Sequence, residues 1–153
     1  MNQVSSTVAP DDVVVCAAIV QQSRPLAARR TSPLKLAGRW ELPGGKVKAG
    51  ESDENALVRE IGEELGVTVT LLERVGADWP LGESVLRVWL GECKGTKDPQ
   101  PLEQHDLLRW VSLEEIDQVS WLPADIEPAR AALTQWLGGS SAVRSRRRSN
   151  RLD

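Results

Sequence analysis

The chain has 153 residues, of which 41% are hydrophobic and 27% are charged, and its formal net charge is −3. This length and composition are typical of one globular domain, and they exclude a disordered chain and a miniprotein that depends on disulfides. The two cysteines lie far apart, the only histidine is His105, and no apolar stretch reaches the roughly 20 residues of a membrane span, so we expect no disulfide framework, no histidine-rich metal site and no membrane partner.

The N-terminal half is predicted to begin with strands. Its first residues contain no basic segment followed by an apolar one, so we expect no secretory signal and a cytoplasmic protein. The apolar run at 13–20 predicts a central strand, and residues 25–30 predict its hairpin partner. Residues 31–38 are expected to form a loop, and residues 39–45 a short strand that runs into a Pro-Gly-Gly turn.

The next predicted element is an acidic helix over 52–65. Ser52 can cap its N-terminus, and Gly66 can adopt the left-handed conformation that ends a helix. On a helical wheel the carboxylates of Glu60, Glu63 and Glu64 share one face. The adjacent face is apolar and is expected to pack against the core; it contains Leu57, Val58, Ile61 and Leu65.

The remainder of the chain returns to strands and ends in a helix. Strands are predicted at 67–75, 84–93 and 107–113, with a proline-containing loop at 95–104. A final helix is predicted within 120–138, and its apolar side contains Ile126, Ala129, Leu133, Trp136 and Leu137. Mixed strands and helices of this kind indicate a sheet with helices on its faces.

The C-terminus differs in composition from the rest of the chain. We expect a domain over 1–138 and a basic, disordered tail over 139–153, whose arginines are Arg144, Arg146, Arg147, Arg148 and Arg151. The tail could recruit RNA or another polyanion, but terminal blocks of charge are commonly just solvated. The rest of the chain is acidic, so we expect no stable nucleic-acid partner, and the sequence predicts no particular oligomeric state.

The crowded acids of the helix over 52–65 allow two interpretations. The first is a solvated acidic face. The second is a metal site, because clustered carboxylate oxygens bind Mg²⁺ or Mn²⁺ and the metal removes their mutual repulsion. Three details favour the metal site: Glu60 and Glu64 lack basic partners four residues on, Gly62 weakens the helix by about 1 kcal/mol relative to alanine, and the predicted turn at Gly44 and Gly45 lets backbone approach a ligand closely.

The spacing of these residues resembles the Nudix box. Gly45 is followed by five residues and Glu51, then by seven residues and the run REIGEELGV at 59–67, which matches the box at every defined position. The segments LAGRWELPGGKV (36–47) and WLPADI (121–126) resemble the MutT-type subgroup of nucleoside triphosphate pyrophosphohydrolases. The resemblance implies a Nudix hydrolase domain with the Nudix fold, an α/β fold in which a mixed β-sheet is sandwiched between helices.

The resemblance also implies a reaction. MutT-type enzymes direct water at a phosphoanhydride and release a nucleoside monophosphate and pyrophosphate, which cleans the nucleotide pool and supports DNA repair. Magnesium is the expected cofactor, and manganese is expected to substitute for it. Carried onto this chain, Glu60, Glu63 and Glu64 would be metal ligands with the Gly44 carbonyl as a backbone ligand. Either Glu60 or Glu64 would orient or deprotonate the water.

Other box residues would support these ligands. By the resemblance, Arg59 would hold a catalytic glutamate in position. Glu51 would help to fix the loop–helix–loop, in which Gly45 and Gly66 are the structural glycines of the box.

Residues outside the box have less specific assignments. Lys46 is a candidate phosphate contact or a solvated lysine, and Arg30 is a candidate nucleotide contact or one half of a surface salt bridge. Related sequences often supply a further acid from the loop before the strand that ends in Trp-Val. Glu103 and Asp106 are available in that loop, but the position where a glutamate is expected holds Gln104.

Asp125 matches a base-contacting position of MutT-type enzymes. An ionised aspartate only accepts hydrogen bonds, so it suits the N4 amino group of cytosine and the N7–H of 8-oxoguanine, but it opposes the O6 of guanine unless it is protonated. Asp125 could instead simply cap the last helix. The predicted substrates are therefore 8-oxo-dGTP and, as an alternative, CTP or dCTP; a further hypothesis is a non-catalytic module that senses a nucleotide.

Overall fold

The computed structural model describes residues 12–139. The predicted basic tail therefore lies outside the described residues, except for Gly139. Between residues 12 and 139, no helix is long and apolar enough to cross a membrane.

The described chain forms one mixed sheet of eight strands. In chain order these are β1 (Val13–Gln21), β2 (Arg24–Arg30), β3 (Trp40–Glu41), β4 (Gly44–Lys46), β5 (Thr68–Arg74), β6 (Trp79–Leu81), β7 (Ser84–Lys94) and β8 (His105–Trp110). Strands β1 and β7 are parallel, whereas the other pairs are antiparallel. The predicted strands are confirmed, with three differences: β8 begins and ends earlier than predicted, the strand predicted over 39–45 is divided into β3 and β4, and β6 was not predicted.

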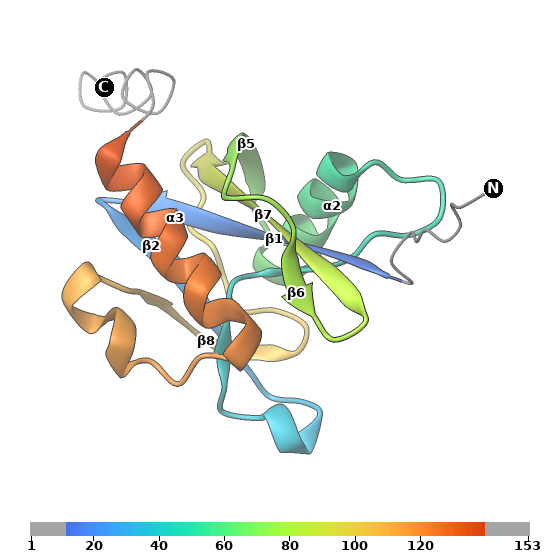
Figure 1. Cartoon of the computed structure of the whole chain (residues 1–153), viewed down its shortest axis with the longest axis horizontal. Helices are drawn as coiled ribbons and strands as arrows, with labels where there is room; N and C mark the ends of the chain where they lie inside the picture. Colours follow the sequence, from blue (N-terminus) through green and yellow to red (C-terminus); the bar gives the residue numbers. More distant parts are fainter. Residues whose placement is uncertain (1–11, 140–153) are drawn as a thin grey trace.

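Helices cover both faces of this sheet. Figure 1 shows α3 (Ile126–Gly138) crossing one face, while α2 (Asp53–Leu65) lies behind the strands. Alternate residues of β1 face the two layers: Val15, Ala17 and Ile19 pack in the core that contains α2, whereas Cys16, Ala18 and Val20 pack in the core that contains α3. A strand buried on both faces reads as a continuous apolar run, which is why 13–20 is so hydrophobic.

The ends of α2 form as the sequence predicts. The Ser52 hydroxyl accepts a hydrogen bond from the Asn55 amide at 3.1 Å, and Gly66 ends the helix with a φ of 69°. Three of the predicted apolar residues are fully buried, namely Leu57, Ile61 and Leu65. The prediction for Val58 is wrong, because this side chain lies at the margin of the buried face and is 37% exposed.

Helix α3 follows a short 3₁₀ turn at Pro123–Asp125 and packs on the opposite face. Ala129, Leu133 and Trp136 are buried as predicted. Ile126 and Leu137 are 37% and 46% exposed, contrary to prediction, because they lie in the first and last turns of the helix, beyond the centre of the packed face.

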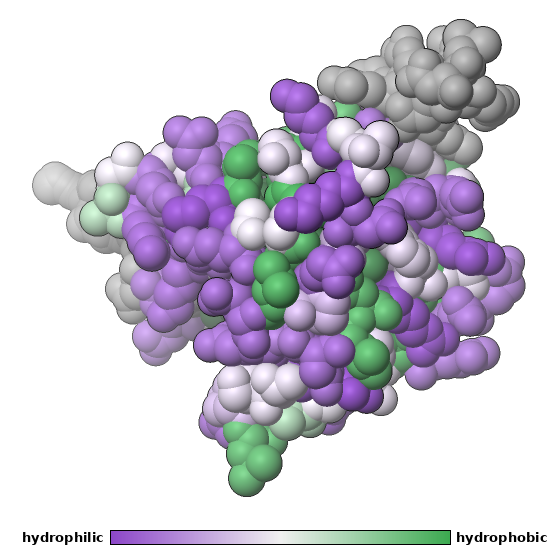
Figure 2. Space-filling model, turned by 180° about the vertical axis from the view of Figure 1, so that it is seen from behind, coloured by the Kyte–Doolittle hydropathy of each residue, from purple (hydrophilic) through white to green (hydrophobic). Residues whose placement is uncertain are grey.

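The surface carries hydrophobic side chains mainly as separate spots. Figure 2 shows, from behind, hydrophobic residues interrupted by hydrophilic ones, with a projecting loop that ends in hydrophobic atoms. Residues 31–38 form a loop as predicted, and it contains a 3₁₀ turn at Leu34–Leu36 whose Leu34 is 91% exposed. This face therefore presents no continuous apolar surface.

A split in the sheet positions the site. Strand β2 pairs with β1 only near the hairpin, at Val20↔Pro25 and Gln21↔Arg24, and then pairs with β3 and β8. Toward the start of β1, strand β4 takes the place of β2, with Gly44 opposite Cys16. The segment between β3 and β4 therefore bridges the two halves of the sheet. The prediction of a turn at Gly44 and Gly45 is wrong, because both residues lie in β4.

Candidate active site

Neighbouring atoms lie so close to the two glycines of β4 that a Cβ atom at either position would force a shift, of backbone at Gly44 and of the Glu60 side chain at Gly45. A Cβ atom on Gly44 would overlap the Val15 carbonyl oxygen and would lie 2.6 Å from the Cys16 Cα. A Cβ atom on Gly45 would lie 2.5 Å from Glu60 Oε1. The glycines thus let β4 lie between β1 and the carboxylates of α2, which are pressed against its backbone.

Glu64 is the most strongly perturbed carboxyl group of this helix. Its Oε1 accepts a hydrogen bond from the Gly44 amide at 3.2 Å. Burial raises the pKa of Glu64 to about 9, and the neighbouring carboxylates Glu41 and Glu60 add to this increase, against a smaller opposite effect of the Gly44 amide. Carboxylates held close together without enough positive charge around them are characteristic of metal sites and catalytic sites.

Arg59 binds the next carboxylates along the helix and the loop before it. Its guanidinium contacts Glu51 through two hydrogen bonds of 2.7 and 3.0 Å, Glu60 Oε2 at 3.0 Å and Glu63 Oε1 at 3.2 Å. Glu51 also accepts from the Lys48 amide at 2.9 Å. The Arg59 hydrogen bonds are the main reason why the pKa of Glu51 falls to about 2. Arg59 therefore joins the loop to the acidic face.

The predicted metal ligands do not all converge. Among residues 12–139, no group of three or more His, Cys, Asp or Glu side chains is arranged to hold a metal ion. The carboxyl groups of Glu60 and Glu64 meet beside β4, whereas Glu63 pairs with Arg59 and its side chain is 47% exposed. This donor set nevertheless fits magnesium, which commonly takes one or two carboxylates and completes its shell with water and substrate phosphates.

A cavity of about 460 Å³ begins at the Gly44–Gly45 backbone. Its polar lining includes Arg30, Glu41, Lys46 and Asp125, and its walls are largely aliphatic, including Leu36, Leu42, Leu81, Leu86, Leu122 and Pro123. The cavity thus combines the predicted substrate-binding residues with an apolar surface of the kind that accepts a planar base.

Asp125 lies buried in this cavity rather than capping α3 with its side chain. Its Oδ2 accepts a hydrogen bond from the Leu42 amide at 2.8 Å, and it makes no side-chain cap hydrogen bond to the helix. Burial raises the pKa of Asp125 to about 7; the Leu42 amide and Arg30 oppose this increase, and Glu41 adds to it. Near neutral pH the group therefore exists in both protonation states.

Arg30 and Lys46 both line the cavity but differ in their freedom. Arg30 is largely buried and donates to Glu41 Oε2 at 2.9 Å. Lys46 is 72% exposed, and its Nζ lies 3.7 Å from the Asp12 carboxylate. Its exposed side chain can swing toward an anion in the cavity.

Glu41 was not predicted from the sequence, and the further acid expected from the loop before β8 is not found at the cavity. Within the described chain, neither Glu103 nor Asp106 lines the cavity, and Asp106 binds Arg29 at 2.8 Å on an exposed face. Glu41, which lies in β3, lines the cavity instead. The sequence signal for it is its place directly before Leu-Pro-Gly-Gly, but its contact with Arg30 depends on strand pairing.

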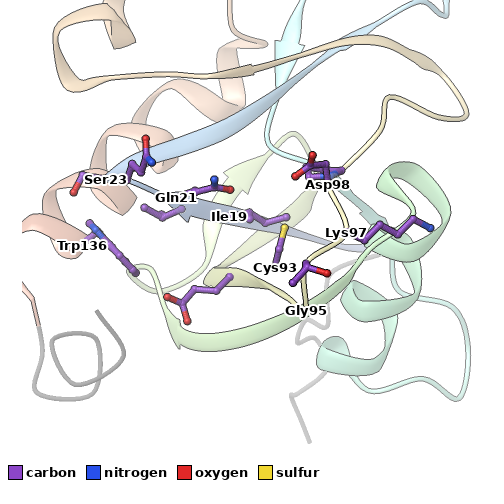
Figure 3. Close-up of a pocket in the computed structure, with 13 residues that line it drawn as sticks. Ile19, Gln21, Ser23, Cys93, Gly95, Lys97, Asp98 and Trp136 are labelled. Carbon is purple, nitrogen blue, oxygen red and sulfur yellow. The ribbon is translucent and has the colours of Figure 1, made fainter. Parts of the chain in front are cut away.

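A second cavity of about 740 Å³ lies toward the other end of β1. Figure 3 shows its lining side chains, which come from the β1–β2 hairpin, the end of β7 with its following loop, and α3. Although this cavity is larger, it contains none of the box residues. Burial also raises the pKa of Cys93 in its wall, which argues against a nucleophilic thiol. The smaller cavity is therefore the candidate active site.

Comparison with known proteins agrees with this geometry. A model of the NUDIX domain matches residues 10–137. The chain is 44% identical to “Putative 8-oxo-dGTP diphosphatase 2” of Mycobacterium tuberculosis, over 90% of this chain and 98% of the relative. It is 35% identical to the CTP pyrophosphohydrolase of Escherichia coli, over 74% of this chain and 84% of the relative.

Solved structures show the same relationship. The crystal structure of a MutT NUDIX hydrolase from Burkholderia pseudomallei aligns with a TM-score of 0.62 and 33% identity, over 81% of this chain and 96% of that chain. The family is known for a divalent-metal requirement, which the paired carboxylates of α2 can meet. The box, the mixed sheet between two helices and these similarities establish that the chain belongs to the Nudix hydrolase family.

Proposed function

We propose that this chain is a magnesium-dependent pyrophosphohydrolase that converts 8-oxo-dGTP to the nucleoside monophosphate and pyrophosphate. The observation that carries the proposal is the junction at Gly44, where the Glu60–Glu64 pair meets a cavity whose wall contains Asp125. The end with the Glu60–Glu64 pair suits a polyphosphate, and the end with Asp125 suits a base.

The metal would be held by Glu60, Glu63, Glu64 and the Gly44 carbonyl. When bound, it would acidify a water molecule and offset the negative charge of the phosphates. Glu63 would have to leave Arg59 to take part, which its exposure permits. Arg59 keeps Glu60 beside β4, so it is expected to preserve the orientation of this carboxylate.

The cationic side chains Lys46 and Arg30 are the proposed contacts for the nucleotide. Lys46 directly follows the glycines of β4 and can reach phosphate oxygens from the cavity rim. Arg30 lies deeper in the cavity wall. Both positions are proposals based on the cavity lining and on the general attraction of cations for phosphate.

Asp125 supports 8-oxoguanine over guanine. A protonated carboxyl group offers a donor and an acceptor side by side, and 8-oxoguanine presents the complementary O6 acceptor and N7–H donor. Guanine presents two acceptors at the same edge, so it can pair with the donor of the carboxyl group but not with its acceptor. The raised pKa of Asp125 makes the protonated form available near pH 7.

CTP is the second candidate substrate. The N4 amino group of cytosine donates to a carboxylate, so the ionised form of Asp125 also suits it. The similarity to a CTP pyrophosphohydrolase gives this candidate independent support.

Steady-state kinetics test these proposals directly. We would measure kcat/KM for 8-oxo-dGTP, dGTP, dCTP, CTP and ADP-ribose with Mg²⁺ and identify the products by chromatography. We expect kcat/KM to be higher for 8-oxo-dGTP than for dGTP, and pyrophosphate to be released. A preference for CTP would establish the second candidate, and nucleotide binding without turnover would instead indicate a sensing module.

The basic tail is not needed for this function. Deletion of residues 139–153 is expected to leave kcat/KM unchanged, because none of the proposed catalytic or binding residues lies there. A loss of about tenfold, equivalent to about 1.4 kcal/mol of transition-state stabilisation, would show that the tail takes part.

A further inference from the structure

A buried ionic cluster forms part of the cavity wall. Glu41 Oε2 accepts a hydrogen bond from Arg30 Nη1 at 2.9 Å and lies 2.8 Å from His105 Nε2. The side chains of Arg30, Glu41 and His105 are 17%, 13% and 1% exposed. They come from three neighbouring strands, because β2 pairs with β3 on one side and with β8 on the other.

A β-bulge determines which residue of β8 lies opposite Arg30. Arg29 pairs with Leu107, but the register then shifts and Arg30 pairs with His105. The residue that is skipped, Asp106, binds Arg29 with hydrogen bonds of 2.9 and 2.8 Å. The two adjacent arginines thus have separate carboxylate partners, one on an exposed face and one in the cavity wall. Bulges beside active sites commonly re-aim side chains in this way.

His105 serves Glu41 as a hydrogen-bond donor. Its Nδ1 is buried and finds no hydrogen-bond partner within the described residues. A proton on Nδ1 would be a buried donor without an acceptor, which is costly, so the geometry favours the tautomer with its proton on Nε2. That proton points to Glu41 Oε2, the same oxygen that accepts from Arg30.

Arg30 keeps part of its donor capacity for a ligand. A guanidinium has five N–H donors. Three bonds are made, to the Ser32 carbonyl at 2.9 Å, to Glu41 at 2.9 Å and to the Gln104 side chain at 3.4 Å. The other two donors have no partner in the described part of the chain, although the residue lines the cavity.

We propose that Glu41 is a positioning residue: held by His105, it fixes the Arg30 guanidinium at the cavity wall in the orientation that binds the nucleotide. This inference rests on the proposed function, since it assumes that a nucleotide occupies the cavity. The carboxylate of Glu41 is already committed to Arg30 and His105, which distinguishes it from Glu64, whose hydrogen-bond donor is the Gly44 amide. Glu41 also raises the pKa of both Glu64 and Asp125, so its carboxylate lies near the proposed phosphate end and near the proposed base end of the cavity.

Kinetics of Glu41→Gln provide the test, with Asp106→Asn as a matched control. Each variant removes the charge of one carboxylate that binds one of two adjacent arginines. With the best triphosphate substrate of the wild type, Glu41→Gln is expected to raise KM about tenfold while kcat changes less than about threefold. Asp106→Asn is expected to leave both constants within about twofold. Equal behaviour of the two variants would overturn the proposal.

A double-mutant cycle with Arg30→Met separates positioning from direct contact. If Glu41 acts through Arg30, Glu41→Gln has almost no further effect on KM in the Arg30→Met protein. Additive effects would overturn the proposal, because Glu41 would then contact the nucleotide itself. Circular dichroism and thermal unfolding would verify folding. If Glu41→Gln does not fold, Glu41→Asp, which withdraws the charge from Arg30, is expected to raise KM in the same way.

The two proposals fail in distinguishable ways. A wild-type protein that binds triphosphates without hydrolysing them would overturn the proposed function, and the same variants would then be compared by Kd from calorimetry. A wild type that turns over normally alongside an unaffected Glu41→Gln protein would overturn only the role of Glu41.

Discussion

The amide of Gly44 donates a hydrogen bond to Glu64 Oε1 over 3.2 Å, which joins β4 to the acidic helix. A side chain at Gly44 would overlap β1, so the backbone at this position can approach the carboxylate only as glycine. The Gly44 amide is a single neutral donor. Burial and two neighbouring carboxylates disfavour the ionised form of Glu64 more strongly than this donor favours it. Without a cation, Glu64 is therefore expected to hold a proton near neutral pH.

Glu64→Gln should abolish function while stabilising the protein. The substitution removes a proposed metal ligand, so Mg²⁺-dependent turnover is expected to fall by at least about a hundredfold. At pH 8 without metal, the folded protein holds Glu64 protonated whereas the unfolded chain ionises it, and glutamine does not carry this cost. The midpoint of thermal unfolding is therefore expected to rise. Parallel kinetics and unfolding experiments would measure both. Wild-type turnover by this variant would rule out the proposed role of Glu64.

Magnesium should stabilise the wild type more at high pH than at low pH. Below its folded pKa of about 9, Glu64 holds a proton that a metal must displace. The Mg²⁺-induced rise in Tm is therefore expected to be larger at pH 8.5 than at pH 6, and to be largely lost in Glu64→Gln. A rise that is independent of pH and survives in the variant would place the ion elsewhere.

Gly45→Ala should reduce activity, in contrast to Gly62→Ala. The new methyl group on Gly45 would meet the Glu60 carboxylate, and this side chain would have to move away from β4. The kcat is therefore expected to fall about tenfold or more. At Gly62 nothing lies within 4 Å of a new Cβ, so alanine there should add about 1 kcal/mol of stability with unchanged kcat. Equal kcat for the two variants would contradict the prediction.

Ionisation of Asp125 should make the protein less stable as the pH rises. Its pKa is raised from 3.8 to about 7 in the folded state, so the folded protein holds the proton more tightly. The stabilisation is complete below the unfolded pKa and is lost as the pH rises to about 7, on the order of 4 kcal/mol in all. Chemical unfolding of Asp125→Asn against wild type from pH 4 to 8 isolates this contribution. A difference between the two proteins that does not vary with pH would refute it.

The same ionisation should change substrate preference. Pairing with 8-oxoguanine requires the protonated carboxyl group, whereas the cytosine amino group can donate a hydrogen bond to either form. The ratio of kcat/KM for 8-oxo-dGTP to that for CTP is therefore expected to fall as the pH rises from 6 to 8. A constant ratio would show that Asp125 does not read the base through its proton.

The features that were predicted correctly are those that depend on residues close together in the sequence. Ser52 and Gly66 specify the ends of α2 wherever it packs, and the spacing of Gly45, Glu51 and Glu60 identified the family. The position of β4 was missed because Gly44 and Gly45 resemble a turn, and only pairing with β1 makes them a strand. The Arg30–Glu41 contact was missed because it depends on strand pairing, just as the contact with His105 depends on a register shift in β8.

Alternate residues of β1 face two different core layers, so substitutions along this strand are expected to have two different kinds of effect. Substitutions at Val15 or Ala17 alter the packing of the layer that contains α2. Substitutions at Cys16 or Ala18 alter the packing of the layer that contains α3, the helix that Asp125 precedes. A lineage could thus remodel nucleobase choice through one row of side chains while the phosphate-cleaving machinery behind the other row stays intact. This partition gives a physical reason why one catalytic segment can accompany diverse substrates.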